Sequence, residues 1–429
     1  MAALPLPPAR LRFHVIMQRR RNQNDTPGGP VSVLSRNDLG ERFALQYQEA
    51  ENRRVICGKD IVLHCHHYNS RLQHAIENAA NVDGKSIFRS AAAFVFTDHI
   101  TRAFKDDDGT AERWAVAQHL YAHLGYGLLD FSRVDDDLVT APTGHFVDGW
   151  LSIYGPREQP VCTFAEGYIQ GAIKAVTGES VMVREDACMI DDQETCRFRI
   201  SRNPDPSSID FPATTFKITP MAKGDAARSE NVDEEAIMKA VVGMPIEGDA
   251  DGLIPKFGVY LACTPVDFYN LASFTFIHRM REQNLHATAR NLLTFCGEIC
   301  GTTTFQGIMS SPEWAALVAP MIKTPADNVF ALVTMSRAFG WGTWCVKEQT
   351  PAESLGMRST SGYEALGYRE RFGPATDPQC FMLNGVSAGM MELIYSPGTI
   401  ADRMGTFLSD EKQCICCARE SCDFEVYPA

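Results

Sequence analysis

The chain has 429 residues, a formal net charge of −13 and a pI near 5.4. Hydrophobic residues make up 45% of it and charged residues 22%, which is ordinary for a globular protein of two or three domains. The acidic balance argues against a duplex nucleic-acid binder, and the lack of a long apolar run argues against a membrane span. With 14 cysteines and no apolar leader pattern, we expect a cytoplasmic protein whose cysteines are thiols or metal ligands.

The predicted elements begin after a polar start. Residues 1–40, rich in arginine, proline and glycine, are expected to form a tail. A β-branched run at 61–65 predicts a strand, and apolar residues at helical spacing predict helices over 86–102 and 112–124. A glycine–tyrosine–glycine sequence at 125–127 then indicates a tight turn.

The next predicted elements are a helix and a hairpin. Small and apolar residues over 163–176 predict a helix, with Gly167 and Gly171 on one face, where we expect the backbone to approach the sheet closely. Apolar runs at 181–183 and 197–200 predict two strands on either side of a loop. The metal module described below would therefore include a hairpin.

A polar segment separates this region from a second, similar series. Residues 203–250 indicate a linker with at most one short helix, near 234–241. A strand at 259–263, a helix at 285–299 and a glycine–tryptophan–glycine turn at 340–342 follow in the same order as before. Such recurrence is typical of a duplicated domain.

A cysteine and glutamate pattern occurs in both series. The spacing E-x-x-C-x7-C appears twice, each time after an upstream cysteine that is followed by glycines at identical offsets. The two sets are Cys162, Glu185, Cys188 and Cys196, and Cys380, Glu411, Cys414 and Cys422. Three thiolates and one carboxylate suit zinc in a closed, four-coordinate structural site. The second set has eight more residues between its first cysteine and its glutamate, which indicates a loop insertion within 396–408.

The duplication sets the expected domain limits. We place an N-terminal tail at 1–40, a first domain at 41–202, a linker at 203–250 and a second domain at 251–429. The expected fold class is α+β, with each domain an antiparallel sheet packed with helices. In each domain zinc would clamp the start of a helix to the C-terminal hairpin, and its binding energy would add to folding stability.

These motifs resemble the vinyl-4-reductase domain, also called the hydrocarbon-binding domain. The features that carry the resemblance are C-x4-G-x3-G, the 23-residue gap to the glutamate, and E-x-x-C-x7-C. That family includes proteins tied to bacteriochlorophyll synthesis and the sensory module of phenol-responsive transcription activators. The resemblance implies a mixed α+β domain with an apolar pocket between sheet and helices. By likeness to the phenol-sensing members, it also implies zinc at the first set, and less strongly at the second.

Other readings of the cysteines stay open. They are separate buried thiols, or they bind an iron–sulfur cluster. In the second set, Cys416 and Cys417 add a further choice, because one of them would replace Glu411 as a ligand or both would be redox-active. If zinc binds, Arg184, Arg197 and Lys412 are expected to offset the negative charge of the ligands.

Three histidines at the end of the first predicted strand, His64, His66 and His67, are candidate catalytic residues. On a strand, His64 and His66 would share a face, where two imidazoles can bind a metal or a tetrapyrrole iron, or move a proton. The second series lacks these histidines, which favours a role specific to the first half. The alternative is that they are ordinary histidines of the fold.

Aromatic and histidine residues near the glycine turns and the metal modules are the expected pocket lining, although core packing explains each one singly. They are Trp114, His119, His123, Tyr126, Trp150, Phe164, Tyr168, Trp341 and Trp344. No nucleophile elbow, phosphate loop or dinucleotide fingerprint is present in the sequence.

The leading hypothesis is a stand-alone, zinc-containing protein with two tandem vinyl-4-reductase-like domains. It would bind a hydrophobic, aromatic or tetrapyrrole-like small molecule, and a homodimer or an enzyme complex is a possible assembly. One alternative is an enzyme or enzyme subunit that acts on such a compound with His64, His66 and His67. A second alternative is a scaffold subunit without a ligand.

Overall fold

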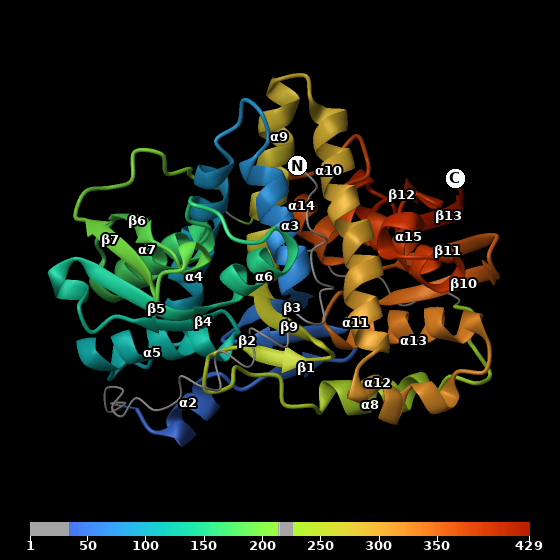
Figure 1. Cartoon of the computed structure of the whole chain (residues 1–429), viewed down its shortest axis with the longest axis horizontal. Coiled ribbons are helices and arrows are strands. Elements are labelled where there is room, and N and C mark those ends of the chain that lie inside the picture. The colour runs from blue at the N-terminus through green and yellow to red at the C-terminus, as the bar shows by residue number, and fades with distance from the viewer. Residues whose placement is uncertain (1–33, 213, 215–225) are drawn as a thin grey trace, which may run out of the picture.

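The computed structural model describes residues 34–212, 214 and 226–429, so most of the tail expected at 1–40 lies outside the described residues. The first half, up to residue 212, contains α2 (Arg36–Arg42), β1 (Gln46–Gln48), β2 (Arg53–Ile56), β3 (Lys59–Cys65), α3 (His66–Glu77), α4 (Gly84–Arg102), α5 (Thr110–His123), β4 (Gly127–Asp130), β5 (Leu138–Gly144), α6 (His145–Ile153), α7 (Thr163–Thr177), β6 (Met182–Ala187) and β7 (Cys196–Ser201). Its elements are coloured blue to green in Figure 1.

The second half, from residue 226, repeats much of that order. It contains α8 (Glu234–Val242), β8 (Ile254–Lys256), β9 (Val259–Pro265), α9 (Val266–Glu282), α10 (His286–Ile299), α11 (Phe305–Met309), α12 (Pro312–Leu317), α13 (Pro325–Ala338), β10 (Trp344–Thr350), β11 (Ser354–Ser359), α14 (Tyr363–Phe372), α15 (Phe381–Tyr395), α16 (Ile400–Arg403), β12 (Phe407–Gln413) and β13 (Cys422–Pro428). The inserted loop expected at 396–408 holds the short α16.

Two outer sheets share one design. Their strand orders are β4-β5-β7-β6 and β10-β11-β13-β12, and every neighbouring pair is antiparallel. Figure 1 shows one sheet on each side of the molecule. The chain is therefore a mixed α+β protein with antiparallel sheets, as the sequence predicted.

The halves meet in a central five-stranded sheet of order β1-β2-β3-β9-β8, which lies between the outer sheets (Figure 1). Strand β3 of the first half pairs with β9 of the second in antiparallel register, with His64 opposite Ala262. Those two positions also correspond in the repeated sequence. A pseudo-twofold axis between the halves therefore passes between His64 and Ala262.

Each half completes the packing of the other. The amide of Leu63 in β3 donates to the carbonyl of Phe339 at 3.0 Å, and the amide of Cys263 in β9 donates to the carbonyl of Leu124 at 2.8 Å. The glycine turn of each half thus holds the N-terminal strand of the other. The Trp341 indole reinforces one side by donating to the carbonyl of Leu63 at 3.0 Å.

Helix pairs form the core of each half, and glycines decide how closely they approach. A Cβ atom on Gly167 in α7 would clash with the carbonyl oxygen of Arg89 in α4, and one on Gly385 in α15 would clash with that of Thr294 in α10. We expected these glycines to face the sheet. They face a helix instead, because the backbones of α4 and α7, and of α10 and α15, lie in direct contact.

Candidate metal centres and interior sites

The first metal centre lies where α7, β6 and β7 meet. Cys162 is the residue before the first turn of α7, Glu185 ends the regular part of β6, and Cys196 begins β7. The sulfur of Cys162 lies 3.9 Å from that of Cys188 and 3.6 Å from that of Cys196, and Cys188 and Cys196 are 3.7 Å apart. These four groups are buried and within reach of a single ion.

The second centre repeats this geometry between α15, β12 and β13. The Cys380 sulfur lies 3.8 Å from that of Cys414 and 3.5 Å from that of Cys422, and the last two are 3.6 Å apart. Glu411 completes the group. All eight residues predicted as metal ligands therefore come together in two sets, as the repeated spacing indicated.

The sulfur spacings fit a tetrahedral ion. A zinc–sulfur bond of about 2.3 Å gives tetrahedral edges of about 3.8 Å, close to the spacings in both centres. Thiols this close surround one ion rather than several irons of a cluster, so the geometry favours zinc over the iron–sulfur alternative.

The glutamates supply the fourth position. One carboxylate oxygen of Glu185 accepts the Cys162 amide at 2.8 Å, and one oxygen of Glu411 accepts the Cys380 amide at 2.9 Å. Within the described part of the chain, the other oxygen of each is buried without a hydrogen-bond partner. Burial and the neighbouring Cys188 raise the pKa of Glu185 to about 9. A bound cation would reverse that shift, so each centre has the vacant acceptor and the anionic neighbours that a metal ligand needs.

A β-bulge at each centre aims the ligands. The register of the hairpin shifts between Glu185 and Ala187 in β6, and at the equivalent place between Glu411 and Gln413 in β12. Bulges of this kind redirect side chains. The cations that we expected to balance the ligand charge are engaged elsewhere: Arg184 pairs with Asp205, Arg197 with Asp186 and Lys412 with Asp410. Their sequence proximity was misleading because neighbouring strand residues point to opposite faces.

His64 is fully enclosed on the pseudo-twofold axis. Its ring stacks on Tyr68 at 4.3 Å and on Trp341 at 5.1 Å, and its Nε2 lies 3.3 Å from the hydroxyl of Tyr363. Burial lowers its pKa to about 3, so the ring is neutral at physiological pH. This environment binds an uncharged imidazole firmly between the halves.

His66 and His67 lie apart from His64. Strand β3 ends at Cys65 and α3 begins at His66, so the strand alternation that we expected for His64 and His66 is wrong. The Nδ1 of His66 accepts the amide of Tyr260 in β9 at 3.1 Å, and the His67 ring packs on it at 4.0 Å. Across the residues that the structure describes, the three histidines do not form a metal-binding group.

A polar network near the axis was missed by sequence reasoning. The Asn69 side chain links the Nε2 of His145, at 2.9 Å, to the hydroxyl of Tyr269, at 2.6 Å. Thr264 then joins Tyr269 to Tyr126 at 3.1 and 2.8 Å. The correspondence of Asn69 with Asn270 in the repeated sequence was the only signal. The network ties elements of both halves together.

The predicted pocket residues of the first half fall into two groups. Tyr126, Phe164 and Tyr168 are fully buried, and their rings pack on one another and on Phe96 and Phe146 at 4.5–5.9 Å. The other four lie outside that cluster. Trp114, His119 and His123 are on α5, where Trp114 stacks on Phe131 and His123 contacts Phe43, and Trp150 on α6 packs against His74, Tyr154 and Arg157.

The interior of the second half contains buried hydrogen-bonding groups left over. Trp341 and Trp344 are buried with ring centres 6.0 Å apart. Trp344 pairs with Ser359 across β10 and β11, and Ser359 pairs with Cys422 across β11 and β13. Among the described residues, neither the indole nitrogen of Trp344 nor the hydroxyl of Ser359 has a hydrogen-bond partner. Ser359 was not among the predicted site residues.

A surface cleft of about 1130 Å³ lies elsewhere, beside α8 and α13. Tyr47, Glu234, Phe330 and Arg337 line it, and Arg337 is paired with Glu234 at 2.6 Å. The predicted pocket residues do not contribute to it. Among the helices of the described residues, none has the length and apolarity to cross a membrane.

Comparison with known proteins identifies the segment that carries the first metal centre. Residues 151–202 match the family model of the vinyl-4-reductase domain, so this part of the chain is such a domain, as the sequence resemblance predicted. It spans α7, β6 and β7, with all four ligands of the first centre.

A solved structure was also found to be similar. It is the crystal structure of the phenol-responsive sensory domain of the transcription activator PoxR with phenol, at 15% identity and a TM-score of 0.33. The similarity covers 40% of this chain and 90% of that one. No curated protein sequence matches the chain.

Proposed function

We propose that the chain is a zinc-containing ligand-binding protein with two vinyl-4-reductase-like domains, and that the second domain binds a small apolar molecule carrying one polar group. The observation that carries this is the row Trp344–Ser359–Cys422 on the inner face of the second outer sheet. It places two buried, unsatisfied polar groups beside a metal ligand in the part of the chain that is described.

Such groups are expensive to leave unpaired. A buried donor without a partner costs about 1–3 kcal/mol, so a ligand that satisfies it recovers that cost. The indole N–H donates only, whereas the serine hydroxyl both donates and accepts. Together they suit a phenol-like hydroxyl or a carbonyl group, with the remainder of the molecule held by apolar side chains.

The surrounding side chains suit an apolar ligand. Met357 lies on the same strand face as Ser359, and α15, which packs on this sheet, brings the buried Met382, Met390 and Met391. Methionine is flexible and polarizable, so it adapts to ligands of different shape. Aromatic rings are well accommodated by such a lining.

The first half supports the contrast. Leu129 and Ala141 occupy the positions that correspond to Trp344 and Ser359, so no polar group stands there. Its buried tyrosines are already paired, since Tyr126 bonds Thr264 and Tyr168 donates to the carbonyl of Ala117 at 2.6 Å. We therefore assign ligand binding to the second half and a stabilising role to the first.

The test compares phenol with toluene, which has no polar group. Phenol should raise the melting temperature of the zinc-loaded protein and change the fluorescence of its buried tryptophans. Trp344→Phe combined with Ser359→Ala should weaken phenol binding about 2- to 10-fold, the worth of one hydrogen bond, and leave toluene binding nearly unchanged.

Tyr168→Phe is the matched control, because it removes a buried hydroxyl from the first half. It should not alter phenol affinity. Equal loss of phenol and toluene binding in the double variant, or no binding of either compound to the wild-type protein, would contradict the assignment.

A further inference from the structure

A fourth thiol lies beside the second metal centre. The sulfur of Cys416 is 3.1 Å from that of the ligand Cys414. That contact is shorter than the 3.5–3.8 Å between the three ligand sulfurs and the tetrahedral edge of about 3.8 Å. Cys416 therefore does not stand at a corner of the coordination sphere. It touches one ligand from outside.

A fifth thiol extends this row toward the surface. Cys417 lies 3.8 Å from Cys416, sulfur to sulfur, and is partly exposed, whereas Cys416 and Cys414 are buried. A single 3-10 turn, Ile415–Cys417, sets the three thiols in line, and its Cys417 amide bonds the carbonyl of Cys414 at 3.0 Å. An oxidant in solvent therefore meets Cys417 first.

The first centre has the same turn without the thiols. Residues Met189–Asp191 form a 3-10 turn that ends in a left-handed residue, Asp192, just as Ala418 ends the turn of the second centre. Ile190 and Asp191 occupy the positions of Cys416 and Cys417. Backbone and ligand geometry agree, so the chain itself provides a centre that differs only in the added sulfur chemistry.

We propose that the second metal centre is a peroxide-sensitive release site, in which a disulfide between Cys414 and Cys416 forms and the metal leaves. The first centre keeps its metal under the same conditions. The proposal rests on the zinc binding proposed above. It assigns the two spare thiols of the second turn a role that the ligand-binding function does not require.

The electrons and atoms balance with hydrogen peroxide as oxidant. The Cys417 thiolate attacks one peroxide oxygen, the O–O bond breaks, and water leaves behind a sulfenic acid. Cys416 attacks that sulfur and releases a second water as the first S–S bond forms. Cys414 then attacks Cys416, and Cys417 departs as a thiolate. In total, two electrons pass from Cys414 and Cys416 to the peroxide, and the metal loses one ligand.

The experiment follows zinc release from the full, zinc-loaded chain with a chromophoric zinc chelator during peroxide treatment. The wild-type protein should release one of its two zinc ions several-fold faster than the other. Peptide mass spectrometry should then find Cys414 linked to Cys416. A dithiol reductant with added zinc should restore the metal content.

Two variants exchange the turns between the centres. Cys416→Ile with Cys417→Asp gives the second turn the residues of the first, so both zinc ions should leave at the slow rate. Ile190→Cys with Asp191→Cys makes the reciprocal change, and should make the first centre sensitive. Circular dichroism before treatment checks that each variant is folded.

Equal release from the wild-type protein and the Cys416→Ile, Cys417→Asp variant would overturn the proposal. Fast release without the Cys414–Cys416 linkage would also overturn it. Metal analysis before the addition of peroxide separates these outcomes from a failure of the second centre itself, because a loaded chain with only one zinc ion would overturn the centre as well as the switch.

Discussion

Burial at single positions sets the chemistry of this protein more than residue type does. His64 is the clearest case, because its enclosure by Tyr68, Trp341 and Tyr363 keeps it neutral. From sequence it was a candidate catalytic group beside two other histidines. The residues around it come from both halves and lie hundreds of positions away in the chain, so no local pattern reports that enclosure.

The first prediction concerns the pH dependence of stability. In the unfolded chain His64 has a pKa near 6.5, and in the folded chain its pKa is about 3. Between those values the unfolded state binds a proton that the folded state does not. Stability therefore falls as pH decreases from 6.5 toward 3, by up to about 1.4 kcal/mol per pH unit for this one group.

Replacing His64 by Phe should remove that contribution. Urea unfolding at several pH values between 7 and 5 should give a free energy of unfolding that declines less steeply for His64→Phe than for the wild-type protein, by up to one proton. His99 and His145, whose pKa values burial also lowers to about 3, keep the remaining slope in both proteins. Parallel pH profiles would refute the prediction.

At the scale of elements, the local patterns were informative. The helix after Cys162, the hairpin around Glu185 and the short helix α8 all form where apolar spacing predicted them. The start of α3 was misplaced because the run His64–His67 has no clear period and the N-cap role of Cys65 is unusual. Close helix pairing at the glycines was also missed, since a regular glycine spacing does not tell whether a helix or a sheet lies opposite.

The second prediction tests the helix contact. Gly167→Ala should destabilise the protein by about 1–3 kcal/mol or more, because the added methyl group meets the backbone of α4 and neither helix can yield locally. Gly40→Ala is the control, since nothing lies within 4 Å of the added group in α2. It should stabilise the protein by about 0.5–1 kcal/mol. Chemical denaturation measures both, and a mild effect of Gly167→Ala would show that the helices can separate.

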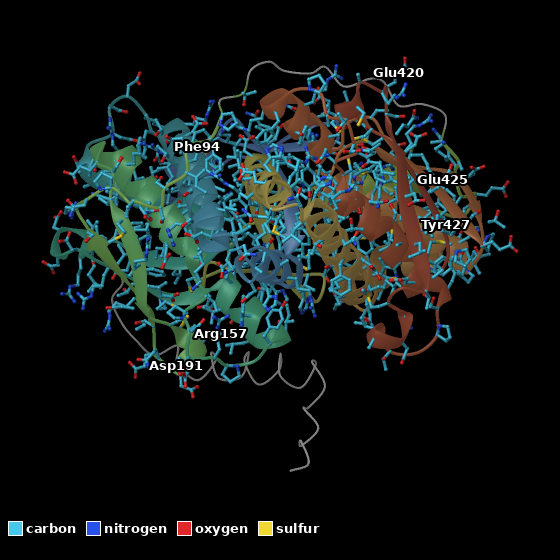
Figure 2. All side chains as sticks on the ribbon, turned by 90° about the horizontal axis from the view of Figure 1, so that it is seen from above. Phe94, Arg157, Asp191, Glu420, Glu425 and Tyr427 are labelled. Atoms are coloured by element: carbon cyan, nitrogen blue, oxygen red, sulfur yellow. The ribbon has the colours of Figure 1, made fainter. Side chains whose placement is uncertain are left out.

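At the scale of the molecule, the two metal centres are far apart. Figure 2 shows Asp191 and Glu420, on the equivalent hairpin loops of the two centres, at opposite corners of the molecule. Distance and the pseudo-twofold arrangement imply that each centre stabilises its own half. The duplicated ligand spacing revealed both centres from sequence, but their relative placement depends on the pairing of β3 with β9.

The third prediction follows from that separation. Cys196→Ser and Cys422→Ser should each reduce the zinc content from two ions to one, because each removes a ligand from one centre. Their effects on the free energy of unfolding should add to within about 0.5 kcal/mol in the double variant. Metal analysis and urea titration provide the two measurements. A strongly non-additive result would indicate that the centres communicate.

The fourth prediction concerns the shared central sheet. Fragments 34–212 and 226–429 expressed separately should aggregate or associate, because each exposes the paired edge of β3 or β9. Expressed together, they should copurify as one complex with the zinc content of the intact chain. Size-exclusion chromatography and light scattering distinguish these cases, and two stable monomeric fragments would contradict the pairing.

The meeting of His64 and Ala262 has a consequence for how such a protein can change over time. In a dimer of identical chains, whatever residue stands at a twofold axis must face its own copy, so two imidazoles or two methyl groups would share the space. Joining the copies in one polypeptide lifts that restriction, because each side of the axis is then encoded separately. One large ring can fill a volume that two could not, and the halves become free to specialise: one keeps a filled, rigid interior while the other holds the unpaired polar groups at Trp344 and Ser359.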